Sequence, residues 1–119
     1  MTEQPAISFK TVRADSPSAS GVAINGEVDV AAVPALEQVL EEAIEATSGG
    51  LVIDLSGVEF MDSSGLLAIL NARGLLAREA RPLAVVCPPG AVRQLVEVAG
   101  VSDLLAPRDS REEAEAALS

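Results

Sequence analysis

Short apolar runs alternate along this chain with longer segments whose apolar residues recur at helical spacing. Residues 51–55 and 83–87 are short and mainly apolar, with several β-branched side chains, as expected of buried strands. Between Pro34 and Gly49, apolar residues recur every three or four positions, which indicates a helix. Strands that alternate with helices pair in parallel through right-handed crossovers. The pattern therefore predicts an α/β fold.

The N-terminal part of the chain adds an antiparallel element to this pattern. Residues 6–13 and 19–25 are β-like runs on either side of the turn-forming segment 15–18, and together they predict a hairpin. A last short strand is predicted near residues 104–106. The sheet is therefore expected to be mixed but mostly parallel.

A second helix is predicted between the segment 62–65 and Pro82, which ends it. Arg78 and Arg81 lie near its predicted C-terminus, where positive charge opposes the helix dipole. Gly74 inside this helix predicts close packing against the sheet or a local bend, because glycine costs up to about 1 kcal/mol there relative to alanine.

Two more helices are predicted in the C-terminal third. Residues 91–99 form one helix, which Gly100 closes. The other begins at Ser110, and Glu113 three residues later completes a capping box in which each side chain bonds the other residue's free amide. The predicted order of elements is ββαβαβαβα.

The length and charge of the chain limit its class. With 119 residues we expect one domain, 1–119, ordered from about residue 5 to residue 118. The net charge of −10 would repel phosphate backbones and anionic lipids, so neither nucleic-acid binding nor membrane insertion is expected. The acidity fits either simple solubility or a basic protein partner, and the sequence leaves both open.

Cys87 is the only cysteine, and the chain has no histidine. A disulfide within the chain is therefore impossible, and no set of residues has zinc-ligand spacing, so no metal or cofactor is expected. Cys87 ends a predicted buried strand and should pack as a small hydrophobe rather than serve in redox chemistry. The sequence has no leader-like start and no apolar run near the roughly 18 residues of a membrane span, which predicts a cytoplasmic protein.

The tetrad Asp62-Ser63-Ser64-Gly65 follows a predicted buried strand and opens an apolar helix. Its hydroxyls lie where free amides and the helix dipole favour negative charge. The simplest interpretation is that one of these residues caps the helix. A hydrolase that uses Ser63 or Ser64 is disfavoured, since the sequence offers no histidine as a base. The protein is therefore not expected to be an enzyme.

The surroundings of the tetrad resemble the STAS domains of bacterial anti-sigma factor antagonists. Residues 52–66 look like the central signature of that family, residues 26–29 match its Gly-Glu-x-Asp motif, and residues 85–101 resemble its later strand, helix and loop. The resemblance runs from about Ile7 to Leu118. It implies a single STAS-like domain, a mixed sheet with about four helices packed on one face, and no catalytic activity.

The resemblance also implies a mechanism. Unphosphorylated antagonist binds an anti-sigma factor that is also a serine kinase of the histidine-kinase-like ATPase fold, and this frees the sigma factor. Phosphorylation blocks binding until a serine phosphatase reverses it. The phosphorylated hydroxyl corresponds to Ser63. Residues that correspond to the partner-binding surface are Glu27, Asp29, Asp62, Ser64 and Gly65.

Two points remain open at this level. Asp29 fits equally well as a local turn or cap acid, and Ala32 stands where many relatives carry a threonine that caps the first helix. The main alternative function is a non-phosphorylated STAS scaffold or adaptor subunit of a signalling or lipid-transport complex.

Overall fold

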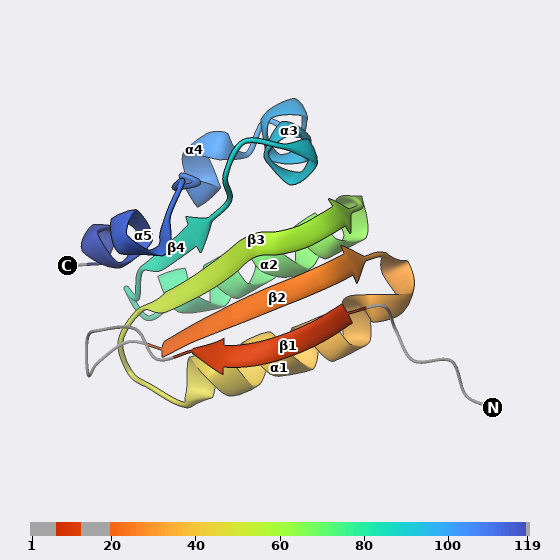
Figure 1. Cartoon of the computed structure of the whole chain (residues 1–119). Coiled ribbons are helices and arrows are strands. Elements are labelled where there is room, and N and C mark those ends of the chain that lie inside the picture. The colour runs from red at the N-terminus through yellow and green to blue at the C-terminus, as the bar shows by residue number, and fades with distance from the viewer. Residues whose placement is uncertain (1–6, 13–19, 119) are drawn as a thin grey trace.

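A four-stranded sheet in the order β1-β2-β3-β4 forms the framework of the protein (Figure 1). The computed structural model describes residues 7–12 and 20–118. The strands are β1 (Ile7–Val12), β2 (Ser20–Val28), β3 (Leu51–Met61) and β4 (Leu83–Val86). β1 is antiparallel to β2, whereas β2, β3 and β4 are parallel. The predicted mixed sheet and N-terminal strand pair are confirmed, and the predicted turn at 15–18 lies outside the described residues.

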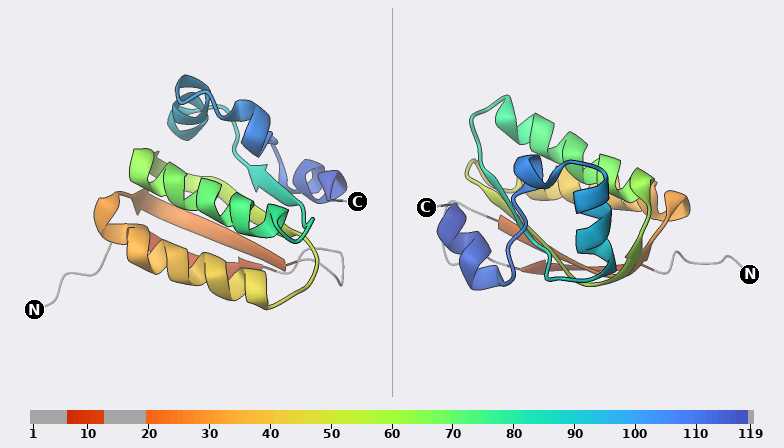
Figure 2. Two further views of the ribbon diagram at one scale, coloured as in Figure 1. Left: turned by 180° about the vertical axis from the view of Figure 1, so that it is seen from behind. Right: turned by 90° about the horizontal axis from the view of Figure 1, so that it is seen from above.

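Helices cover this sheet unequally on its two faces. They are the 3-10 turn η1 (Val30–Ala32) and the helices α1 (Val33–Glu45), α2 (Ser63–Ala77), α3 (Ala91–Val98), α4 (Ser102–Leu105) and α5 (Arg111–Ala117). α1 and α2 lie side by side on one face, and α5 lies on the other (Figure 2). The α/β class and the approximate number of helices agree with the sequence prediction.

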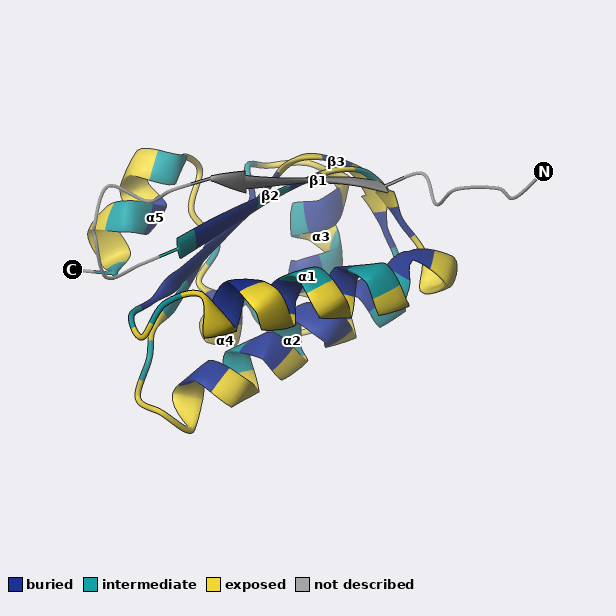
Figure 3. Ribbon diagram, turned by 90° about the horizontal axis from the view of Figure 1, so that it is seen from below, coloured by how far each residue is buried: buried dark blue, intermediate teal, exposed yellow. Residues whose placement is uncertain are grey.

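The main core lies between the sheet and α1, α2 and α3. Alternate residues of β3, such as Leu51 and Ile53, join this core, as do Leu36 of α1 and Ile69 of α2. Figure 3 shows the buried sides of α1 and α2 turned toward the sheet and their exposed sides turned away. This arrangement follows from the period-2 pattern of the strand and the 3.6-residue pattern of the helices.

A second, smaller apolar cluster lies beneath α5. Val52 of β3 joins Ala84 and Val86 of β4 and Ala114 of α5 in this cluster. The Arg111 guanidinium donates to the Asp54 carboxylate over 2.8 Å and so ties α5 to β3. β3 is therefore buried on both faces over its first half.

β3 is longer than the sequence predicts. The prediction ended the strand at residue 55, but β3 continues to Met61, which pairs with Val28. The register with β2 shifts between Ala23 and Asn25 and between Gly26 and Glu27. These irregularities break the simple alternation of buried and exposed residues, so the second half of the strand resembles a loop in sequence.

The strand predicted near residues 104–106 is wrong, because Ser102–Leu105 forms α4. Ala106 ends this helix with a positive φ of 43°. The chain then makes one parallel bridge to the sheet: Arg108 N–H donates to Val85 O, and Cys87 N–H donates to Arg108 O, each over 2.8 Å. The observed order is thus ββαβαβααα, with η1 directly before the first helix.

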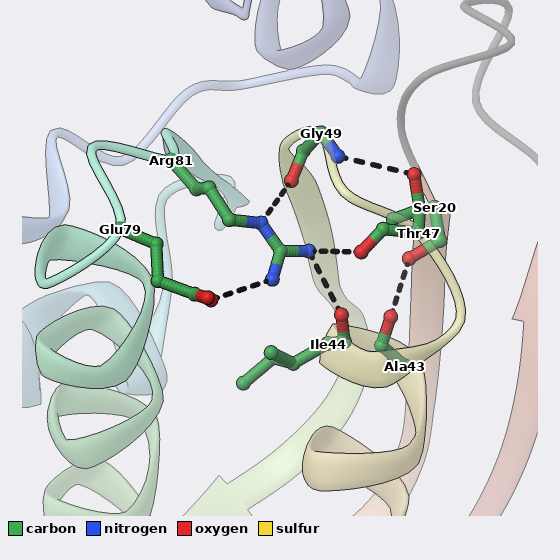
Figure 4. Close-up of polar contacts among 7 residues, drawn as sticks. All are labelled: Ser20, Ala43, Ile44, Thr47, Gly49, Glu79 and Arg81. Atoms are coloured by element: carbon green, nitrogen blue, oxygen red, sulfur yellow. Dashed lines mark hydrogen bonds and ion pairs between the residues drawn. The ribbon is translucent and has the colours of Figure 1, made fainter.

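Arg81 also departs from its predicted role. α2 ends at Ala77, and the Arg81 guanidinium instead binds the C-terminal end of α1 (Figure 4). Its Nη2 donates to Ile44 O over 2.8 Å and to Thr47 O, and its Nε donates to Gly49 O over 2.7 Å. The cation therefore satisfies one carbonyl in the last turn of α1 and two carbonyls of the segment that follows it.

Candidate functional site

Two neighbouring parallel strands end side by side, and each is followed by an aspartate. Val28 at the end of β2 pairs with Met61 at the end of β3, so Asp29 and Asp62 follow at the same edge of the sheet. Asp62 N–H donates to Val28 O over 3.1 Å. Each aspartate caps the helical segment that begins after it. The edge therefore carries two helical N-termini, where free amides and helix dipoles favour negative charge.

Asp62 is the N-cap of α2. Its Oδ1 accepts from the amides of Ser64 over 3.0 Å and Gly65 over 3.2 Å, and also from the Ser64 hydroxyl. The pKa of Asp62 is lowered, chiefly by the hydrogen bond from the Ser64 hydroxyl. Partial desolvation acts against this shift, whereas hydrogen bonds from backbone amides, including that of Val30, lower the pKa further. The helix is therefore capped by the acid, and not by a serine.

Asp29 caps η1 in the same manner. Its Oδ1 accepts from Ala31 N–H over 3.0 Å and from Ala32 N–H over 3.2 Å. Ala32 is buried and offers no side-chain cap to α1. The local capping interpretation of Asp29 is therefore confirmed, and its side chain is still exposed to solvent. Asp29 therefore caps η1, while α1 begins after its N-cap Ala32 without a side-chain cap.

Ser63 and Ser64 have opposite environments. Ser64 is half-buried, and its hydroxyl donates to Asp62. Ser63 is the first residue of α2, is exposed, and its hydroxyl takes part in no hydrogen bond among the described residues. Of the two adjacent serines, Ser63 is therefore the more exposed, and its hydroxyl is not held by Asp62.

Gly65 lets α2 begin in close contact with the strand ends. A Cβ at this position would lie 2.7 Å from Val28 Cγ1 and 3.0 Å from Met61 Cγ. Contacts this short force neighbouring atoms to move. Gly65 is itself buried, so it contributes to the site by allowing this close packing and not by contact with a partner.

Two apolar side chains that the sequence interpretation missed lie beside Ser63. Leu67, four residues later on the same side of α2, is 57% exposed, and Val30, whose amide reaches Asp62, is 70% exposed. We call Val30, Ser63 and Leu67 the Ser63 surface. Because α2 is apolar around most of its circumference, its sequence pattern does not reveal which leucine faces solvent.

Glu27 lies apart from this surface. It is exposed near the end of β2 and pairs in register with Phe60 of β3, which is 49% exposed. The structure thus brings Asp29, Asp62, Ser63, Ser64 and Gly65 together at the two helical N-termini, with Glu27 on the adjoining strand.

Neither a metal-ligand cluster nor an exposed thiol is found among the described residues. Among the described residues, no three or more His, Cys, Asp or Glu side chains are placed to hold a metal ion. Cys87 is buried, and burial raises the pKa of its thiol, while the charge of Arg93 opposes this. Within the part of the chain that the structure describes, no helix is long and apolar enough to cross a membrane.

Comparison with known proteins decides the family. The sequence profile of the STAS domain matches residues 12–114. An anti-sigma-B factor antagonist of Staphylococcus aureus is 30% identical over 84 residues, which are 71% of this chain and 78% of that protein. The chain belongs to the STAS domains of the anti-sigma factor antagonist family.

Solved structures place this STAS domain in the same group. A crystal structure of an anti-sigma factor antagonist from Mycobacterium paratuberculosis is 30% identical, with a TM-score of 0.81 and 98% of each chain covered. SpoIIAA in its unphosphorylated form has a TM-score of 0.72 at 21% identity, covering 89% of this chain and 92% of that one. The phosphorylated form of SpoIIAA, from Bacillus, has a TM-score of 0.67 at 20% identity, covering 89% and 96%. At these lower identities, the likeness to SpoIIAA shows that the two proteins share a fold, and nothing more.

Proposed function

We propose that this STAS domain is an anti-sigma factor antagonist controlled by reversible phosphorylation of Ser63. The unmodified protein binds an anti-sigma factor that is also a serine kinase of the histidine-kinase-like ATPase fold, and the sigma factor is released. The kinase transfers the γ-phosphoryl group of ATP to the Ser63 oxygen, which loses its proton, and ADP leaves. A serine phosphatase later hydrolyses the phosphoserine. These events belong in the cytoplasm.

The observation that carries this proposal is the difference between the two adjacent serines. Ser63 presents an exposed hydroxyl without a partner among the described residues, whereas the Ser64 hydroxyl is held by Asp62. A kinase must approach the attacking oxygen with its nucleotide, and the hydrogen bond of Ser64 opposes this approach. The geometry therefore favours phosphorylation at Ser63 over Ser64.

The Ser63 surface also has the chemistry of a protein interface. Val30 and Leu67 present exposed apolar side chains at the two helical N-termini, and Asp29 adds an exposed charge there. Apolar contacts in the middle of an interface with polar groups at its edge are usual for protein complexes. A phosphate on Ser63 would lie among these contacts.

A phosphate at this position would weaken binding without a change of fold. It adds about −1.5 to −2 charges. Near a partner carboxylate, at about 4 Å and an effective dielectric constant of about 20, the repulsion is about 4 kcal/mol per charge pair. A third of this energy corresponds to roughly a tenfold loss of affinity. Within the protein, the N-terminus of α2 favours the phosphate and the Asp62 carboxylate opposes it.

The test is intact-mass spectrometry of the protein after incubation with ATP and each histidine-kinase-like anti-sigma candidate of the same genome. We expect one phosphate on the wild type and on Ser64→Ala, and none on Ser63→Ala. Modification of Ser63→Ala but not of Ser64→Ala would contradict the choice of site. If no candidate modifies the wild type, the non-phosphorylated scaffold or adaptor becomes the better explanation.

A further inference from the structure

A groove runs between α1 and α2 at the end of these helices opposite to Ser63. It has a volume of about 310 Å³. We call it the α1–α2 groove and define it by its lining residues, Glu41, Ile44, Glu45, Leu75, Arg78 and Glu79. A smaller hollow of about 30 Å³ continues it along the helix pair and shares Glu41, Ile44 and Leu75 as lining residues.

Glu41 and Glu45, which form no ion pair among the described residues, line the α1 side of this groove, and Glu37 lines the smaller hollow. Glu37, Glu41 and Glu45 follow one another at intervals of four residues on the exposed side of α1. The ion pairs among the described residues are Arg81–Glu79, Arg93–Asp109 and Arg111–Asp54, and none includes these three glutamates. Like charges at this spacing destabilise a helix. The arrangement therefore slightly destabilises α1, and a cationic ligand would offset this cost.

The α2 side of the groove carries the exposed Leu75 together with the charged Arg78 and Glu79. Leu75 of α2 is 42% exposed, whereas its neighbour Leu76 is fully buried in the core. Together with Ile44 of α1, Leu75 offers an apolar floor beside the row of carboxylates. Three lining carboxylates, Glu41, Glu45 and Glu79, outnumber the one lining cation, Arg78, so the groove suits an amphipathic ligand of net positive charge.

We propose that the α1–α2 groove binds a basic amphipathic helix of a protein partner. A helix laid between α1 and α2 would place an apolar side chain on Leu75 and basic side chains, spaced by one turn, beside Glu41 and Glu45. The charge selects this occupant. A second copy of a chain with net charge −10, an anionic membrane and a nucleic acid would each be repelled by the carboxylate row.

The groove goes beyond the proposed switch because it operates in both states of Ser63. Leu75 is twelve residues after Ser63 in α2, which corresponds to about 18 Å along a helix. This separation is about twice the Debye length of ~8 Å at physiological ionic strength. A phosphate on Ser63 therefore leaves the groove almost unaffected, and a partner bound there would hold the phosphorylated protein as well.

The test is a titration of the isotope-labelled protein, followed by amide chemical shifts, with a synthetic peptide of leucine and lysine that forms an amphipathic helix. We expect the shifts to cluster around the groove in the C-terminal halves of α1 and α2. Glu41→Gln combined with Glu45→Gln, and separately Leu75→Gln, should each weaken binding about fivefold, which corresponds to about 1 kcal/mol. Ser63→Glu should bind as the wild type does.

The matched control is Glu59→Gln combined with Glu97→Gln, which removes the same charge from exposed positions outside the groove. A second control is titration of the wild type with a scrambled peptide that cannot form an amphipathic helix. The two controls separate binding in the groove from general electrostatic attraction between the basic peptide and the acidic protein. Equal weakening by the two double variants would overturn the proposal. Three other results would also overturn the proposal. They are chemical shift changes centred on Ser63 or on the sheet, equal binding of the scrambled peptide, and self-association of the protein in place of peptide binding.

Discussion

Asp62 connects the chemistry of the site to its fold, because one carboxylate caps α2 and also holds the Ser64 hydroxyl. Its pKa is lowered from the ordinary 3.8, chiefly by that hydroxyl. The pKa of Asp54 is lowered too: burial raises it, but the hydrogen bonds from Ser56 and Arg111 together outweigh burial. Near these pKa values the folded state binds fewer protons than the unfolded state. Both carboxylates therefore stabilise the protein fully above their unfolded pKa.

This stabilisation should be lost as the pH falls through the lowered native pKa of each carboxyl. Asp62→Asn keeps a side chain that caps helices but cannot ionise. We expect the free energy of unfolding of the wild type to exceed that of Asp62→Asn at pH 7, and the difference to shrink below about pH 4. Urea denaturation of both proteins from pH 7 to pH 2.5 measures this. A difference that is constant over this range would mean that Asp62 does not titrate with folding.

Two glycines of α2 should respond oppositely to the same substitution. Gly65→Ala places a Cβ 2.7 Å from Val28 Cγ1, so we expect a loss of about 1–3 kcal/mol in the free energy of unfolding. Nothing lies within 4 Å of a Cβ at Gly74, so Gly74→Ala should gain up to about 1 kcal/mol. Chemical denaturation of the two variants measures both changes in the free energy of unfolding. Equal changes for Gly65→Ala and Gly74→Ala would contradict the contacts described for the two positions. The close packing predicted from sequence at Gly74 is thus wrong.

At the scale of the elements, Arg81 is the main tie between the segment after α2 and the end of α1 (Figure 4). A lysine keeps the charge but cannot reach three carbonyls with a planar fork of donors. We expect Arg81→Lys to lower the free energy of unfolding by about 1–2 kcal/mol, because carbonyls at the end of α1 lose their partners. Glu79→Gln is the control, since it removes only the exposed Arg81–Glu79 ion pair and should cost less than about 0.5 kcal/mol. Similar losses for both variants would assign the effect of Arg81 to that ion pair.

The elements differ in how well the sequence predicts them. α1 is predictable because its buried residues recur at helical spacing, and α5 because Ser110 and Glu113 mark its start. Even there, Ser110 Oγ accepts from Glu113 N–H, but the Glu113 carboxylate accepts from Asp109 N–H and not from Ser110 N–H. The short apolar segment at 104–106 is compatible with either a strand or a helix, and its tertiary contacts determine that residues 102–105 form the helix α4. Arg81 binds residues more than 30 positions away, which no local pattern indicates.

At the candidate site, sequence reasoning located the region but not the arrangement of its atoms. The order strand, Asp62-Ser63-Ser64, apolar helix predicts a helix N-terminus with hydroxyls. It does not determine whether the acid or a serine is the cap, and this choice decides which hydroxyl faces solvent. Val30 was missed because its exposure depends on η1, a single turn that the sequence does not predict.

At the scale of the whole molecule, the sheet brings the ends of β2 and β3 together and leaves the far end of the α1–α2 pair for a separate surface. The parallel register that pairs Val28 with Met61 places Asp29 and Asp62 at one edge. The net charge of −10 favours basic partners over the whole surface, while local geometry distinguishes the Ser63 surface from the α1–α2 groove. Phosphorylation of Ser63 is therefore expected to affect binding at one end of the molecule.

The most direct test of this account compares the affinity of the cognate anti-sigma factor for the unmodified protein and for the protein phosphorylated at Ser63. Isothermal titration calorimetry at fixed ionic strength measures both, and thermal unfolding of the two forms checks that the fold is unchanged. We expect binding of the phosphorylated form to be at least tenfold weaker, with closely similar unfolding temperatures. Equal affinity of the two forms would contradict the switch at Ser63.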